Sequence, residues 1–112
     1  MAKRVLITGA NGHIGANLTR HLLEAGHTVR VLQHKHNEAL DSLNVEIAQG
    51  DIRNTELVQR AVEGCEVVFH LAAKSSVMPR VHSSIREINV GGTRNVAIAC
   101  LKEGVDRLLH CS

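Results

Sequence analysis

The sequence predicts an α/β fold with a doubly wound parallel sheet of about five strands. Two observations support this prediction. Short runs of β-branched and aliphatic residues alternate with longer segments whose apolar residues recur at helical spacing. The first run, residues 5–7, leads directly into glycines at Gly9, Gly12 and Gly15. Helices that join parallel strands by right-handed crossovers cover both faces of such a sheet.

The expected elements follow one another along the chain, which we treat as one small domain, residues 1–112. The strand-like runs are residues 5–7, 28–32, 45–48, 66–69 with a continuation into 70–73, and 107–111. The helical segments run over residues 13–25, 38–43, from 54 or 55 to 64, and from 83 or 84 to 104. Residues 74–82 contain the only proline and are expected to form a loop.

Apolar residues repeat at three- and four-residue intervals in the long helical segments, and a glycine follows each as a stop signal. Such a repeat places one stripe of the helix against a core. The stripes are Ile14, Leu18, Leu22 and Ala25; then Leu57, Val58, Ala61 and Val62; then Ile85, Ile88, Gly92, Val96 and Ala99.

The composition is that of an ordinary globular protein, with 44% hydrophobic and 21% charged residues and a formal net charge of +2. The cations are scattered, which argues against binding to nucleic acid or to an acidic membrane. No apolar run reaches the roughly 18 residues that cross a bilayer, so we expect a soluble, cytoplasmic protein. The three cysteines and the pair His34 and His36 lack the spacing of a metal site, and none is expected.

The glycine turn predicts a site for a phosphate group. The N–H groups at the start of a helix lack partners within the helix, and the helix dipole favours negative charge there. Gly9 supplies the turn, Gly12 lets a pyrophosphate approach the backbone, and Gly15 lets the helix pack closely on the strand. The spacing G-x-x-G-x-x-G differs from the general G-x-G-x-x-G fingerprint, so a purely structural turn is the alternative.

Polar or small residues follow every predicted strand. In an open parallel sheet, ligands bind beyond the carboxyl ends of the strands, where the strand order reverses. Five turns therefore converge on one edge, which favours a dinucleotide site over a structural turn. The turns are residues 8–15, 33–36, 50–52, 70–74 and 110–112.

The end of the second strand favours NADP over NAD. An acidic residue there accepts a hydrogen bond from the ribose 2′-hydroxyl of NAD, whereas basic groups suit the 2′-phosphate of NADP. Gln33 is followed by His34 and Lys35, Arg30 lies upstream, and no carboxylate occurs before Glu38. The alternative is that these cations are ordinary solvated side chains and that Gln33 accepts NAD.

Asp51 follows Gly50 at the end of the third strand. One interpretation is a carboxylate that accepts a hydrogen bond from the adenine amino group. The other places Asp51 in the first turn of the next helix, where an acidic residue is also favourable. Ala72 and Ala73 allow a flat ring or ribose to approach closely, or simply pack.

With these motifs assembled, the chain resembles the extended short-chain dehydrogenase/reductase family, in its NAD-dependent epimerase/dehydratase and dihydroflavonol-reductase-like group. The resemblance covers essentially all 112 residues. The chain is similar to the N-terminal, Rossmann-type NAD(P)-binding portion of that family. The motifs that carry it are T-G-A-N-G-H-I-G at 8–15, G-D-I at 50–52, H-L-A-A at 70–73, N-V-G-G-T-R-N-V at 89–96, and the strand 108–112.

The resemblance implies which residues contact the cofactor. The three glycines hold the pyrophosphate, Gln33 and His34 face the adenosine ribose, Asp51 and Ile52 meet adenine, and residues 71–73 line the nicotinamide side. The expected cofactor-binding residues are Gly9, Asn11, Gly12, His13, Ile14, Gly15, Gln33, His34, Lys35, Asp51, Ile52, Leu71, Ala72 and Ala73.

The sequence departs from the family at the catalytic residues. Members carry a Ser or Thr just after the fifth strand and a Tyr-x-x-x-Lys further on, in which the tyrosine exchanges a proton with substrate. This chain contains no tyrosine, and Ser112 corresponds to the position before the catalytic serine. We therefore expect a fragment truncated before the last strands and the substrate region, with no catalytic residue of its own.

Truncation would leave the fifth strand at an exposed edge, with Leu108 and Leu109 prone to pair with another chain. We expect marginal stability or self-association, weak cofactor binding and no turnover, with a homo-oligomer left open.

Three functional hypotheses remain at this point. The leading one is the cofactor-binding part of an oxidoreductase, epimerase or dehydratase that transfers hydride between NAD(P) and a small carbonyl or sugar-nucleotide substrate. The others are a non-catalytic NAD(P)-sensing regulator of the same superfamily and a structural subunit with a vestigial glycine turn.

Overall fold

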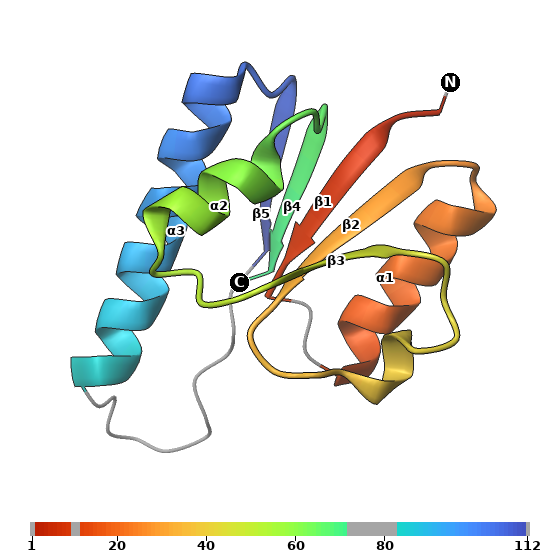
Figure 1. The fold of residues 1–112 in the computed structure, drawn as a ribbon, viewed down its shortest axis with the longest axis horizontal. Helices are drawn as coiled ribbons and strands as arrows, with labels where there is room; N and C mark the ends of the chain where they lie inside the picture. The colour runs from red at the N-terminus through yellow and green to blue at the C-terminus, as the bar shows by residue number, and fades with distance from the viewer. Residues whose placement is uncertain (1, 10–11, 72–82, 112) are drawn as a thin grey trace.

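A computed structural model of the chain describes residues 2–9, 12–71 and 83–111. It confirms the predicted α/β fold, with five parallel strands in the order β3-β2-β1-β4-β5 and helices packed on both faces (Figure 1). The elements are β1 (Arg4–Thr8), α1 (Gly12–Glu24), β2 (Thr28–Gln33), the 3₁₀ turn η1 (Glu38–Leu40), β3 (Glu46–Gln49), α2 (Thr55–Val62), β4 (Val67–Leu71), α3 (Ser83–Glu103) and β5 (Arg107–Cys111).

The strand order reverses between β1 and β4. From β1 the chain moves outward through β2 to β3, then returns to the other side of β1 for β4 and β5. Strands β1 and β4 pair directly, with Thr8 opposite His70 at their carboxyl ends. The switch point, where open α/β sheets bind ligands, therefore lies between these two strands.

Two apolar cores flank the sheet because successive side chains of a strand point to opposite faces. On one face α1 and η1 cover Val5, Ile7 and Val31. On the other, α2 and α3 cover Leu6 and Val68. The central strand β1 is buried on both sides from Val5 to Thr8, as a parallel strand covered by helices must be.

The predicted helical stripes are confirmed in α2 and in the described part of α3. Val58, Ala61 and Val62 of α2 are buried, and Val96 and Ala99 of α3 pack against them. The side chains of Ile85 and Ile88 lie outside the described residues. Helix α2 begins at an N-cap, where the Asn54 side chain accepts a hydrogen bond from the Leu57 N–H at 3.2 Å.

The stripe predicted for α1 is wrong at both of its ends. Leu18 and Leu22 pack on the core, but Ile14 is 78% exposed and Ala25 is also exposed. Ile14 lies in the first turn of α1, which projects beyond the sheet. The helix predicted at 38–43 is also shorter, because only the 3₁₀ turn Glu38–Leu40 forms there.

Arg30 does not contribute to the expected phosphate site. Its guanidinium crosses the sheet face to the end of α2, where Nη1 donates hydrogen bonds to the carbonyl groups of Ala61 at 2.7 Å and Glu63 at 2.9 Å. It also pairs with Glu46 at 3.4 Å. A cation at the C-terminal end of a helix satisfies carbonyl groups that lack helical partners, so Arg30 stabilises α2.

Strand β5 forms one edge of the sheet, as expected, and leaves Leu108 and Leu109 exposed by 38% and 36%. None of the helices in the described part of the chain is long and apolar enough to cross a membrane.

Candidate functional site

The carboxyl ends of β1 and β4 lie side by side at one edge of the sheet, where the first predicted turn begins (Figure 1). Gly9 follows β1 directly and has φ of +72°, a conformation that favours glycine. A Cβ atom at this position would lie 1.7 Å from the carbonyl oxygen of Leu71. Gly9 is therefore required both by its backbone conformation and by the close approach of the two strand ends.

Helix α1 begins at Gly12, three residues after Gly9, and no acidic residue occurs in its first turn. Gly15 is buried, and its carbonyl group accepts a 2.7 Å hydrogen bond from the hydroxyl of Thr19. The helix thus presents its N-terminus to the edge where the strands end, which is the arrangement that binds anions. Asn11 and the side chain of His13 lie outside the described residues.

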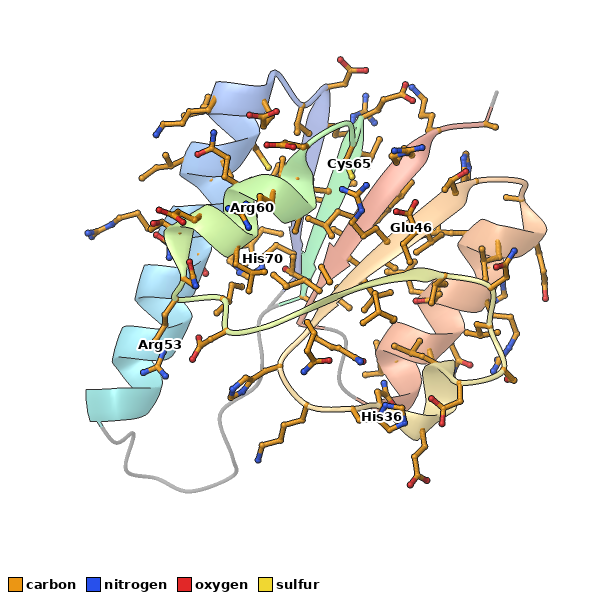
Figure 2. All side chains as sticks on the ribbon, viewed as in Figure 1. His36, Glu46, Arg53, Arg60, Cys65 and His70 are labelled. Carbon is orange, nitrogen blue, oxygen red and sulfur yellow. The ribbon has the colours of Figure 1, made fainter. Side chains whose placement is uncertain are left out.

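His70 joins three elements at the switch point and lies in the interior of the molecule (Figure 2). Its Nδ1 lies 2.5 Å from the hydroxyl oxygen of Thr8 in β1, and its Nε2 lies 2.9 Å from the hydroxyl oxygen of Thr93 in α3. Its ring stacks on that of His110 in β5, with centroids 5.2 Å apart. Burial, and to a smaller extent the neighbouring His110, lowers the pKa of His70 to about 4, so the ring is neutral at pH 7.

Gln33 ends β2 within a chain of amide hydrogen bonds. The Gln49 amide donates to the carbonyl group of His34 at 2.6 Å, and the Gln33 amide donates to the oxygen of the Gln49 side chain at 3.2 Å. Because a backbone carbonyl only accepts hydrogen bonds, this series of hydrogen bonds fixes which end of each side-chain amide is the nitrogen. The Gln33 Oε1 atom is then a buried acceptor without a partner among the described residues.

Asp51 lies in the loop after β3, not in the first turn of α2, which begins four residues later. Both of its carboxylate oxygens accept hydrogen bonds from the Arg53 side chain, the shortest at 2.6 Å. The hydrogen bonds from Arg53 lower the pKa of Asp51 to about 2, and the nearby His34 acts in the same direction. The Asp51 charge is therefore compensated by a cation that Figure 2 shows beside α3.

Asn95 of α3 fixes the same loop and was not predicted as a site residue. Its amide donates hydrogen bonds to the carbonyl groups of Ile52 at 3.0 Å and Arg53 at 3.1 Å. Gly92, one turn earlier, allows close contact, since a Cβ there would lie 2.7 Å from the Ile52 side chain. The motif at 89–96 contained this signal, but nothing in the sequence indicated its partner.

The structure thus gathers most of the predicted cofactor residues at one edge, in three groups. Gly9 meets Leu71 at the switch point, the N-terminus of α1 follows, and a third group surrounds the ends of β2 and β3. In that third group Gln33 and Ile52 are half-buried, while His34 and Lys35 are exposed. Ala72 and Ala73 lie outside the described residues.

Comparison with known proteins identifies the family. Residues 6–112 match the model of the 3-beta hydroxysteroid dehydrogenase/isomerase family. The chain belongs to this family. The match confirms the resemblance to the extended short-chain dehydrogenase/reductases that the sequence motifs indicated.

Relatives of the chain are longer than the chain itself. Sterol demethylase protein B from Methylococcus capsulatus is 40% identical over 109 residues, which cover 96% of this chain and 33% of that protein. A putative dihydroflavonol 4-reductase from Synechocystis is 36% identical and is covered to the same 33%. The chain therefore spans about a third of the length of these curated relatives.

A solved structure supports the fold assignment. The Bordetella bronchiseptica enzyme WbmG in complex with NAD and UDP superimposes with a TM-score of 0.82 at 32% sequence identity, covering 98% of this chain and 37% of that one.

Replacing Gly9 tests the close approach at the switch point. Gly26→Ala is a matched control, because Gly26 also has positive φ, at +92°, but has open space around its Cβ position. The left-handed conformation alone costs about 1–2 kcal/mol, whereas overpacking against the Leu71 carbonyl adds about 1–3 kcal/mol in Gly9→Ala. Urea denaturation should show the larger loss in Gly9→Ala, and equal losses would contradict the assigned contact.

Titration of His70 predicts a specific pH dependence of stability. The folded-state pKa is about 4, below the ordinary value of 6.5, so its contribution is complete above pH 6.5 and is lost as the pH falls through about 4. The unfolding constant should rise by up to tenfold per pH unit in this window. The Asp51 contribution is lost only below its ordinary pKa of 3.8. In His70→Gln, the unfolding constant measured by denaturation should lose most of its dependence on pH between 6.5 and 4. His21→Gln, at an exposed position of α1, should retain that dependence.

Proposed function

We propose that residues 1–112 form the cofactor-binding portion of an NAD(P)-dependent oxidoreductase, epimerase or dehydratase. The observation that carries this proposal is the contact of Gly9 with the Leu71 carbonyl at the switch point, next to the N-terminus of α1. A turn this close to β4 has no space for a side chain at Gly9, as expected where the backbone approaches a ligand. Membership of the family supports the same class of function.

The residues present fit a nicotinamide dinucleotide. The N-terminus of α1 provides N–H groups for the pyrophosphate. At the end of β2, the Gln33 oxygen, which has no partner within the described part of the chain, provides an acceptor for a ribose hydroxyl. When bound, the nicotinamide ring supplies the hydride acceptor or donor for a carbonyl or sugar-nucleotide substrate.

We propose that the preferred cofactor is NADP. His34 and Lys35 are exposed beyond the end of β2, and the carboxylate that lies nearby, Asp51, is compensated by Arg53. A 2′-phosphate therefore meets Lys35 and His34 rather than an unpaired acid. Arg30, which the sequence also favoured for this role, is excluded because it caps α2.

Residues 1–112 alone should bind the cofactor without turnover, because the chain contains no tyrosine to act as proton donor. The Tyr-x-x-x-Lys pair of the resembled family would have to come from another part of the whole protein. A non-catalytic NAD(P)-sensing regulator shares the binding site and differs in lacking that pair.

Isothermal titration with NADP⁺ and NAD⁺ tests this proposal. We expect NADP⁺ to bind about tenfold more tightly, which corresponds to one charge-assisted contact. Lys35→Glu should remove or reverse this preference by repelling the 2′-phosphate, while Lys102→Glu, exposed near the far end of α3, should leave it unchanged. Equal affinities would overturn the NADP assignment, and binding of neither nucleotide would overturn the proposed function.

A further inference from the structure

We propose that one stretch of α3, residues 92–95, positions both halves of the cofactor crevice, Asn95 acting on the loop after β3 and Thr93 acting through His70 on the end of β4. This inference rests on the proposed function. Neither side chain is assigned a contact with the cofactor, so both are positioning residues.

The Asn95 contact fixes the first half of the crevice. Its amide donates to two consecutive carbonyl groups, Ile52 at 3.0 Å and Arg53 at 3.1 Å. Gly92 lies three residues earlier, on the same face of the helix, and meets the Ile52 side chain. The loop that carries Asp51 is thereby held by α3 in addition to the hydrogen bonds between Asp51 and Arg53 within the loop.

The Thr93 contact fixes the second half. Its hydroxyl oxygen lies 2.9 Å from His70 Nε2, while the other ring nitrogen faces Thr8. His70 is 5% exposed, so an unpaired ring nitrogen would be costly there. The bridge links α3 to β4 one residue before Leu71, which lies against Gly9.

Helix geometry explains how one stretch serves both halves. With 3.6 residues per turn, side chains two positions apart point in directions roughly 200° apart. Thr93 and Asn95 therefore contact different neighbours. Dinucleotide folds consist of two mononucleotide-binding halves that meet at the switch point. Strands β1 to β3 form one half here, and β4 with β5 belongs to the other.

Two probes separate the roles of the two residues. Adenosine 2′,5′-bisphosphate occupies only the first half, whereas NADP⁺ spans both. Asn95→Leu should weaken both probes by about fivefold to tenfold, the equivalent of one or two lost hydrogen bonds. Thr93→Val should weaken NADP⁺ by about fivefold and leave the bisphosphate within about twofold.

Thr93→Ser restores the hydroxyl and should recover NADP⁺ affinity, which separates the hydrogen bond from side-chain packing. Arg94→Lys lies between the two residues, keeps its charge and should change neither affinity. Urea denaturation of each variant establishes that it is folded at the temperature of the titration.

The outcomes distinguish this inference from the proposed function. If the unaltered chain binds NADP⁺ and Thr93→Val weakens both probes equally or neither, the positioning role is overturned and the proposed function stands. If the unaltered chain binds neither NADP⁺ nor NAD⁺, the proposed function fails, and this inference fails with it.

Discussion

The close contact between the ends of β1 and β4 is the constraint on which the candidate site depends. Gly9 can lie against the Leu71 carbonyl only because it has no side chain and adopts positive φ. One residue earlier, Thr8 meets His70 through side chains that are both buried. Together the two contacts hold the ends of β1 and β4 against each other where the strand order reverses, next to the N-terminus of α1.

The site is built from polar groups whose burial reduces stability unless they are paired. His70 is stabilised by two hydroxyl groups, and Asp51 by Arg53. Gln33 is the exception, because its oxygen is buried without a partner among the described residues. Such an atom costs about 1–3 kcal/mol, a cost that a ligand hydroxyl would offset. Helix α3 adds the remaining support through Thr93 and Asn95.

Local sequence patterns predicted most of the fold because they report burial directly. The stripe of α2, the described part of the α3 stripe and the continuous apolar run of β1 correspond to faces that are buried in the structure. The pattern failed for Ile14, whose position in a helical repeat says nothing about whether that turn projects beyond the sheet. It also failed for Arg30, because a side chain's direction across the sheet depends on strand alternation and on where α2 ends.

The site was predicted as a set of strand ends, but its supporting contacts were not. Asn95 and Ile52 are 43 residues apart, and His70 and Thr93 are 23 apart. A single sequence has no local signal for pairs at such separations. Helical periodicity places Thr93 and Asn95 on α3, and only the packed structure shows which neighbour each one meets.

The most direct test of the account is an NMR titration of the ¹⁵N-labelled chain with NADP⁺. A dinucleotide at the switch point should shift the amide signals of Gly9, Gln33 and Leu71, which lie at the carboxyl ends of their strands. The signals of Gly26, Gly64 and Gly104, which precede strands at the opposite edge, should stay in place. Shifts concentrated at those three glycines, or spread evenly over both edges, would contradict the assigned site.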